Sequence, residues 1–364
     1  MILLYVLAFV VLINCGFYVL FSKFSFLRPS EKSTQHTYPV SVIVCAKNEA
    51  DNLTQHIPLL LQQEFPNFEV ILINDASSDN TYEVMEQFAE IDPRVKLVNV
   101  KNNEAFWGNK KYALTLGIKK AVNKRMLFTD ADCRPATKHW LAEMTSKLDQ
   151  NTQLVLGYGA YEKMKGLLNA LIRFETLITA TQYFSYAKAG IPYMGVGRNL
   201  AYTSQLYYDN QGFMKHIQLP SGDDDLFVNG AATAENTDIC FSETSFTISK
   251  PKTTFGDWIR QKRRHITTAR LYKPLHKFLL GLYFTSNLFF WLVVPFCIIF
   301  ASWQITLAIV LFRFLVQYII LGKAAKKLQE NKLIPFLPFL ELFLVCFQLS
   351  IFISNSNKKP TRWK

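Results

Sequence analysis

An uncharged apolar stretch opens the chain and limits the folds that are open to it. Residues 1–21 contain no Asp, Glu, Lys or Arg. A helix rises about 1.5 Å per residue, so this stretch is long enough to cross a hydrocarbon core of roughly 30 Å. Because no basic region precedes it and no small-residue cleavage site follows it, a membrane anchor is favoured over a cleaved signal peptide.

Three further apolar runs lie toward the other end, at residues 278–300, 303–322 and 334–354. Only Ala301 and Ser302 separate the first two, which predicts a tight transmembrane hairpin. The third run contains two prolines and Glu341. A full span, a re-entrant segment and an interfacial helix therefore all stay open for residues 334–354.

Basic residues beside these runs predict their orientation, because cytoplasmic loops of membrane proteins are enriched in Lys and Arg. They follow the first run (Lys23, Arg28, Lys32) and the hairpin (Lys323, Lys326, Lys327, Lys332). We expect a multi-pass protein of the inner cell membrane with the intervening domain in the cytoplasm. A full span by residues 334–354 would place the basic tail outside, against this rule.

The composition agrees with a membrane protein that also has a water-soluble domain. Half of the 364 residues are hydrophobic, 30 are Phe, and 19% are charged, against about a quarter in ordinary soluble domains. The net charge of +12 gathers beside the apolar runs, so nucleic acid is not an expected partner. The six cysteines show neither CxxC pairs nor zinc-site spacing, and we expect them to be reduced.

Residues 38–250 alternate short β-branched runs with helical patterns, which predicts an α/β domain with a mostly parallel sheet. Strands are expected at residues 40–45, 68–74, 95–100 and 125–129. Ligands of such sheets bind at the carboxyl ends of the strands. Glu49, Asp75, Asp130 and Asp132 all follow predicted strands, so we expect several acids to meet at one edge.

Asp130 and Asp132 are separated by one residue directly after a predicted strand. Their carboxylates can bind one cation, and Mg²⁺ and Mn²⁺ are commonly coordinated by carboxylate oxygens together with substrate phosphates. Taken alone, this DxD pattern is a weak signal, because acidic turns are common. Together with a diphosphate substrate it predicts a metal site at Asp130 and Asp132.

Five motifs in a fixed order make a family resemblance specific. They are VSVIVCAKNE (40–49), INDASSDNT (73–81), FTDADCRP (128–135), SGDDDL (221–226) and QKRRH (261–265). This set resembles glycosyltransferase family 2 with the GT-A fold, and it is similar to membrane-integrated members such as polysaccharide synthases and ceramide glucosyltransferase. The resemblance implies an α/β GT-A domain that uses a nucleotide-sugar donor, and a UDP-sugar is the expected one.

The resemblance also implies roles for individual residues. Glu49 and Asp75 would hold the nucleoside, and Lys110 would approach the base or the diphosphate, with Lys111 as the alternative. Asp130 would contact both the donor and the metal ion. The motif QKRRH matches the family's QxxRW pattern at Gln261 and Arg264, and it has His265 where tryptophan is usual.

The side chains of this last motif suit a sugar diphosphate. Arg264 is the candidate for the diphosphate, because a guanidinium group matches phosphate oxygens. His265 can stack on an acceptor, with less area than an indole. Residues 251–277 around the motif are basic with interleaved apolar side chains, which predicts an amphipathic helix in the headgroup region.

The acidic run 221–226 is expected to supply the catalytic base. Family members place this base three residues before a leucine, which selects Asp223, with Asp224 as the second choice. Adjacent carboxylates repel one another, and this tends to raise a pKa toward neutrality. Gly195 and Gly197 precede the run, and we expect them to let the backbone approach a bound sugar.

These expectations combine into an inverting, metal-dependent glycosyltransferase that serves a lipid-linked or glycan acceptor at the membrane. A base on the acceptor side implies a single displacement with inversion at the anomeric carbon. The alternatives are a processive polysaccharide synthase, a membrane-bound nucleotidyltransferase or phosphotransferase, and an inactive nucleotide-binding scaffold. The few apolar runs after the domain favour single transfer over a self-contained polysaccharide channel.

Overall fold

The computed structural model describes residues 1–28, 38–101, 110–219 and 221–357. Lys32, the basic tail after residue 357, and residues 108 and 109 of the motif around Lys110 lie outside this part. The chain divides into two compact units, neither of which is continuous in sequence. The helical unit comprises residues 1–28, 164–189 and 252–357, and the α/β unit comprises residues 38–163 and 190–251.

The described strands of the α/β unit form a seven-stranded sheet in the order β3-β2-β1-β4-β8-β6-β9. Their bounds are β1 Val40–Ala46, β2 Phe68–Asp75, β3 Val95–Val100, β4 Arg125–Asp130, β6 Leu154–Leu156, β8 Leu200–Thr203 and β9 Thr237–Ile239. Strands β1 to β4 are parallel neighbours, whereas β8 is antiparallel to β4 and β6. The four strands expected from the sequence and the mostly parallel sheet are confirmed.

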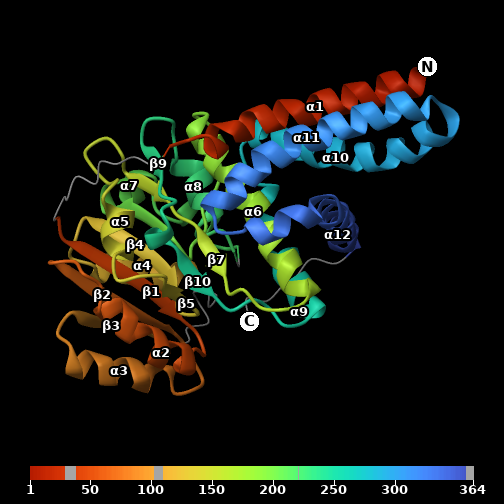
Figure 1. Ribbon diagram of the computed structural model, residues 1–364. Coiled ribbons are helices and arrows are strands. Elements are labelled where there is room, and N and C mark those ends of the chain that lie inside the picture. Colours follow the sequence, from red (N-terminus) through yellow and green to blue (C-terminus); the bar gives the residue numbers. More distant parts are fainter. Residues whose placement is uncertain (29–37, 102–109, 220, 358–364) are drawn as a thin grey trace. The chain divides into compact units, whose positions relative to one another are not determined.

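Helices cover this sheet and account for the continuous apolar runs of its central strands. The helices of the unit are α2 Ala50–Leu61, α3 Thr81–Ile91, α4 Lys110–Lys120, α5 Trp140–Thr145, α7 Ser204–Asp209 and α8 Asp225–Ala231. Every residue of β2 is buried, and in β1 only Cys45 is partly exposed. Helix α3 packs on β3, and α4 packs on β1 and β2 (Figure 1). Strands covered on both faces are mostly apolar, so they show no regular alternation of apolar and polar residues.

The strand order creates a crevice at one edge of the sheet. Strand β1 lies between β2 and β4, so the connections that leave β1 and β3 go to opposite sides of it. Such a switch point is where ligands bind in open α/β sheets. In register, Cys45 of β1 pairs with Asp130 of β4. A second sheet, β5 Cys133–Pro135 with β10 Thr247–Ser249 and β7 Gly159–Tyr161, begins three residues after β4 ends.

The helical unit consists of long helices. They are α1 Ile2–Ser25, α6 Leu167–Lys188, α9 Phe255–Ala269, α10 Pro274–Phe300, α11 Trp303–Lys327, the 3-10 helix η4 Asn331–Phe336 and α12 Leu337–Asn357. Helix α1 packs along α10 and α11, and Figure 1 shows the three side by side. Among the described residues, four segments are long and apolar enough to cross a membrane: Ile2–Ser25, Pro274–Phe300, Trp303–Lys327 and Asn331–Asn355.

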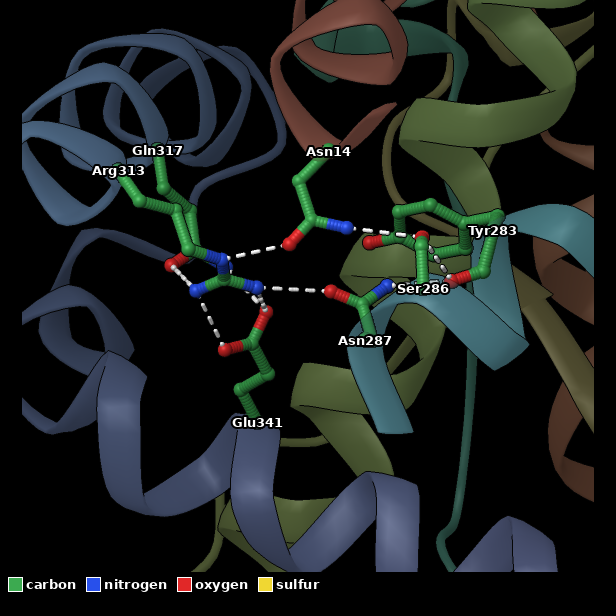
Figure 2. A network of polar contacts seen from close by, with 7 residues as sticks. All are labelled: Asn14, Tyr283, Ser286, Asn287, Arg313, Gln317 and Glu341. Carbon is green, nitrogen blue, oxygen red and sulfur yellow. Dashed lines mark hydrogen bonds and ion pairs between the residues drawn. The ribbon is translucent and has the colours of Figure 1, made fainter. Parts of the chain in front are cut away.

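A polar network inside these apolar helices joins four of them (Figure 2). Arg313 of α11 is fully buried, and its two Nη atoms donate to the carboxylate of Glu341 on α12 at 2.8 and 2.9 Å. It also donates to Asn14 of α1, Asn287 of α10 and Gln317 of α11. All five guanidinium N–H groups are therefore used. Burying the charge is tolerable only because it is paired and hydrogen-bonded in this way.

Candidate active site

The loops that follow β1 and β2 are bonded to each other at the carboxyl edge of the sheet. The backbone N–H of Asn48 donates to Ser77 Oγ at 3.0 Å, and the N–H of Ser78 donates to Asn48 Oδ1 at 2.8 Å. The N–H of Glu49 donates to Thr81 Oγ1 at 2.8 Å. Asn48 has a positive φ of 55°, which asparagine adopts more readily than most residues. These bonds hold the two loops as one unit.

An open polar cavity of about 390 Å³ lies in these loops. Its lining residues are Asn48, Glu49, Ala50, Asp51, Asn52, Asp79 and Asn80. Glu49, one of the predicted nucleoside ligands, accepts a hydrogen bond from Asn52 Nδ2 at 2.6 Å. The cavity is within the size range of small-molecule pockets.

Asp75 ends β2 and is 2% exposed. Burial raises the pKa of its carboxyl, and the charges of Lys47 and Lys110 oppose that rise. Its Oδ2 is buried and has no hydrogen-bond partner among the described residues. A buried acceptor without a donor costs free energy. This oxygen therefore suits an N–H or O–H group brought by a ligand.

Lys110, at the start of α4, joins two acids that lie far apart in the sequence. Its ammonium nitrogen is 2.7 Å from Asp130 Oδ1 and 2.9 Å from Asp223 Oδ2. Burial alone would lower the pKa of Lys110, but the two carboxylates outweigh it and hold the pKa well above its usual value. All three side chains line a narrow cavity over β1, β4 and β8. The end of β4, the start of α4 and the acidic run thus form one charged site.

Lys111, the alternative to Lys110 in the sequence, has a different place. It is 1% exposed, and its ammonium group donates to the backbone carbonyls of His216 and Leu219 at 2.6 and 2.7 Å. Burial lowers the pKa of Lys111 to about 8. It thereby holds the segment that leads into the acidic run, whereas Lys110 contacts the acids themselves.

Asp130 and Asp132 bring their carboxylates together beyond β4. With Cys133 they place three potential ligand atoms within 4.8 Å of one another. Burial and the charge of Asp130 raise the pKa of Asp132, and burial raises that of the Cys133 thiol well above its usual value. A protonated thiol is a poor ligand for hard cations. The two carboxylates fit Mg²⁺ or Mn²⁺, which complete their coordination with phosphates and water.

The acidic run begins with a turn that requires glycine. Gly222 has a φ of 102°, and a Cβ on it would lie 2.5 Å from Leu226 Cδ1. Asp224 follows and accepts hydrogen bonds from the N–H groups of Gly197 at 2.8 Å and Asp225 at 2.7 Å. The turn therefore fixes Asp224 against the backbone at Gly197.

The two candidate bases have opposite protonation tendencies. Burial, with the charges of Asp223 and Asp225, raises the pKa of Asp224 to about 7. Burial also acts on Asp223, but the ammonium group of Lys110 outweighs it and holds the pKa of Asp223 below its usual value. Asp224 therefore has the better-matched pKa for proton transfer near neutral pH.

The segment from Gly195 to Asn199 is fixed on its buried side. The Asn199 side chain donates to the carbonyls of Tyr158 and Ser245 and accepts from Trp140 Nε1. A Cβ on Gly195 would lie 3.0 Å from Leu156 and Leu200, so close packing by itself explains this glycine. A contact between either glycine and a sugar stays a prediction.

Arg198 is a charged residue at this edge that the sequence analysis did not single out. Its guanidinium carbon lies 4.3 Å from the centre of the Tyr161 ring, and it donates to Ser249 Oγ at 3.0 Å. Its positive charge opposes the rise in the pKa of Asp132. A Cβ on Gly159 would lie 2.4 Å from Arg198 Nε, so this glycine makes room for the side chain. The sequence feature that could have pointed to Arg198 is its position directly after Gly195 and Gly197.

Gln261, Arg264 and His265 lie on α9, in the helical unit. The helix is capped by Thr254, whose Oγ1 accepts from the N–H of Asp257 at 3.1 Å. Contacts of the three residues with a donor or an acceptor stay predictions.

Comparison with known proteins shows what this chain resembles. Residues 41–201 match the sequence profile described as Glycosyl transferase family 2. The chain is 32% identical over 169 residues to 4,4'-diaponeurosporenoate glycosyltransferase of Staphylococcus haemolyticus, covering 45% of this chain and 44% of that protein. It is 30% identical over 144 residues to an uncharacterized glycosyltransferase of Haemophilus influenzae, covering 40% and 41%. The chain thus spans less than half the length of these relatives.

The fold is also that of a solved glycosyltransferase. The mannosyltransferase PcManGT from Pyrobaculum calidifontis, in complex with GDP-Man and Mn²⁺, superposes with a TM-score of 0.59 at 17% sequence identity. The match covers 93% of this chain and 99% of that one. The GT-A fold expected from the sequence motifs is therefore confirmed.

Proposed function

We propose that this chain, whose residues 41–201 match the sequence profile of glycosyl transferase family 2, moves a sugar from a nucleoside diphosphate sugar to an acceptor at the membrane. The observation that carries this proposal is the pairing of Lys110 with both Asp130 and Asp223. It joins a carboxylate pair suited to a metal ion and a diphosphate with an acidic turn suited to an acceptor hydroxyl. Transfer of a group from a diphosphate requires charged groups that are already in position at the leaving group and at the attacking hydroxyl.

The donor would occupy the edge formed by the loops after β1 and β2. Glu49 lines the polar cavity there, and Asp75 offers a buried oxygen that lacks a donor among the described residues. These two residues would bind the nucleoside. We keep UDP-sugars as the expected donors, with GDP-sugars as the alternative because PcManGT is described with GDP-Man.

Asp130 and Asp132 would hold a divalent cation. When bound, Mg²⁺ or Mn²⁺ would neutralise negative charge on the departing diphosphate. The Mn²⁺ named with PcManGT supports this choice. Lys110 would turn from Asp130 toward the diphosphate oxygens, and Arg198 would add a second positive charge on the other side of Asp132.

Asp224 would accept the proton of the acceptor hydroxyl, with Asp223 as the second candidate. This order reverses the one expected from the sequence. It is supported by the pKa of about 7 for Asp224 and by the engagement of Asp223 with Lys110. A base opposite the leaving diphosphate gives a single displacement, so the anomeric configuration would be inverted.

The chain would carry out this transfer on the cytoplasmic face of the inner membrane. Helices α1, α10 and α11 would cross the bilayer, and Gln261, Arg264 and His265 of α9 would contact the substrates. The acceptor would be lipid-linked or another glycan at the membrane. The relatives include both a 4,4'-diaponeurosporenoate glycosyltransferase and a poly-beta-1,6-N-acetyl-D-glucosamine synthase, so single transfer is favoured by the few membrane helices and not by the relatives.

Product analysis with the purified full-length protein tests this function. Membrane lipid extract, Mn²⁺ and a panel of UDP- and GDP-sugars would be supplied, and products identified by mass spectrometry and their anomeric configuration by NMR. We expect one donor to give an inverted product, and Asp132→Ala to abolish its formation. Asp209→Asn, which removes an exposed carboxylate, is the matched control. A retained configuration, or full activity of Asp132→Ala, would contradict the proposal.

A further inference from the structure

Helix α12 is the least obvious of the four apolar segments. Together with η4 it is long and apolar enough to span a membrane, as Asn331–Asn355. Pro335 lies in η4 and Pro338 in the first turn of α12, so neither interrupts the helix interior. Length and hydropathy alone therefore allow a full crossing. The contacts of α12 within the helical unit point to a different path.

Helix α12 runs beside α9 and in the same direction. Phe343 lies 6.3 Å from Phe255 between ring centres, and Phe347 stacks on Trp258 at 4.0 Å with an angle of 9° between the rings. Near the end of α12, Asn355 exchanges two hydrogen bonds with Arg263, of 2.8 and 3.0 Å. The contact positions advance together along both helices, so the two are parallel neighbours.

Helix α9 cannot cross a hydrocarbon core. Four of its 15 residues are Lys or Arg, and a charged residue at the centre of a membrane helix is costly unless it is paired. Arg260, for example, is 81% exposed. In sequence, α9 lies between the α/β unit and the first residue of α10, so it stays on the side where α10 begins. The end of α12, bonded to α9 through Asn355, must lie on that same side.

The start of the η4–α12 segment lies on that side too. Because α10 and α11 form a hairpin, the beginning of α10 and the end of α11 share one side. There, Lys327 of α11 donates to the backbone carbonyls of Phe24 and Leu27 at the end of α1. Glu330, just before η4, pairs with Arg173 of α6. The segment thus starts at the end of the bundle where α1 ends and α10 begins, and its last residues contact α9 on that same side.

The inner end of the segment is the polar network around Arg313. Arg313 precedes the last residue of α11 by 14 positions, which is roughly 20 Å along a helix. Glu341, in the first turns of α12, pairs with it there. Figure 2 shows this carboxylate below the guanidinium group, with Asn14 and Asn287 to the right of that group. Backbone that turns inside a membrane is tolerated where protein surrounds it.

We propose that η4 and α12 form a re-entrant segment that enters the bilayer to the depth of Arg313 and returns to the side of the α/β unit. The chain then crosses three times, through α1, α10 and α11. The apolar side chains that α12 exposes would contact the acyl chains of that one leaflet (Phe339, Leu342, Phe352, Ile353). With this path the end of α12 lies on the side that the positive-inside rule predicts for the basic tail. This inference rests on the membrane crossing of α10 and α11 in the proposed function.

Cysteine labelling in sealed vesicles of known orientation tests the proposal. The full-length protein with Cys346→Ser is the background and the blank. Asp51→Cys reports the α/β unit, Ala301→Cys the turn between α10 and α11, and Lys364→Cys the end of the chain. We expect a membrane-impermeant maleimide to reach positions 51 and 364 from one side and position 301 from the other.

Two other labelling patterns would each contradict a different part of the proposal. Labelling of position 364 together with position 301 would show that α12 crosses, and would overturn the re-entrant path. Labelling of positions 51 and 301 from the same side would instead refute the crossing of α10, and with it the membrane part of the proposed function. Transfer activity of these variants is measured separately, so the sugar chemistry is judged on its own.

A cross-link tests the pairing of α9 with α12 in the membrane. Arg263→Cys combined with Asn355→Cys should be joined by a short bis-maleimide, because the two side chains are bonded to each other. Arg263→Cys with Phe339→Cys is the control, since Phe339 lies at the opposite end of α12, and it should give no cross-link. Equal yields for both pairs, or none for the first, would contradict the proposal.

Discussion

Lys110 pairs with Asp223 at 2.9 Å, so a cation at the start of a helix partly neutralises the acidic turn that carries both candidate bases. The same ammonium group reaches Asp130 at 2.7 Å. A single side chain therefore adjusts the charge on the proposed donor side and on the proposed acceptor side of the site. Its removal should affect the chemical step more than the fold of the sheet.

Replacing Lys110 with Met should lower kcat/KM by about 100-fold to 1,000-fold, the usual effect of losing one electrostatic group that stabilises a transition state. Lys110→Arg should recover part of the loss, because it keeps the charge in a different shape. Lys119→Met removes an exposed cation from the same helix and should leave kcat/KM unchanged. Steady-state kinetics with the identified donor measure all three. If kcat/KM of the Lys110→Met variant stays within threefold of the wild-type value, Lys110 has no role in the reaction.

The acidic limb of the pH–rate profile should reflect Asp224. A base must be ionised to accept a proton, and the pKa of Asp224 is raised to about 7. We therefore expect kcat/KM to fall tenfold per pH unit below about pH 7. Asp223→Asn removes the neighbouring negative charge and frees Lys110, and both changes lower the pKa of Asp224. The limb should then move to lower pH, and a limb that stays in place would contradict the coupling of the two acids.

The same raised pKa predicts how stability depends on pH. A carboxyl with a raised pKa in the folded state binds its proton more tightly there than in the unfolded state. Its contribution to the free energy of unfolding is complete below its ordinary pKa near 4 and is lost as the pH rises through about 7. Thermal unfolding should show this decline for the wild type and a smaller decline for Asp224→Asn. Equal declines would show that the protonation of Asp224 does not contribute to the pH dependence of the free energy of unfolding.

Arg198 should contribute to donor binding through the space that Gly159 leaves. Arg198→Gln should raise the KM for the donor about tenfold to 100-fold, because a charge-assisted hydrogen bond contributes roughly 1.5–3 kcal/mol. Gly159→Ala should have a similar effect without touching the charge, since its Cβ would lie 2.4 Å from Arg198 Nε. Gly230→Ala has no atom within 4 Å of the new Cβ and is the control. An unchanged donor KM in both variants would exclude Arg198 from donor binding.

The sequence predicts the framework of this protein because its signals are local. The apolar runs of β1, β2 and β4 and the acids that follow them are readable along the chain. The choice between Lys110 and Lys111 is not, because adjacent helical residues point about 100° apart and only packing decides which one meets the acids. The order of Asp223 and Asp224 depends on the position of Lys110, which lies outside the acidic run. Arg198 fits beside the acids because Gly159, on β7, leaves room for its side chain.

The role of Glu341 in α12 could not be predicted from the sequence either. In the sequence, Glu341 reads as an interruption of an apolar run, because its partner Arg313 is on another helix. The ion pair with Arg313 shows instead that Glu341 attaches α12 to α11. This pairing also yields a stability prediction that does not depend on the proposed sugar chemistry.

Arg313→Met should destabilise the protein strongly, by about 3–5 kcal/mol, because it leaves the carboxylate of Glu341 without its partner inside the bundle. Glu341→Gln should cost less, since the amide oxygen can still accept from the guanidinium group. The double variant Arg313→Met with Glu341→Leu should recover most of the loss, because it removes both charges and leaves an apolar contact. Thermal unfolding in detergent, followed on the full chain, measures the four proteins. If the double variant is as unstable as Arg313→Met, the shape of the polar network, and not the compensation of its charges, holds α12 against the bundle.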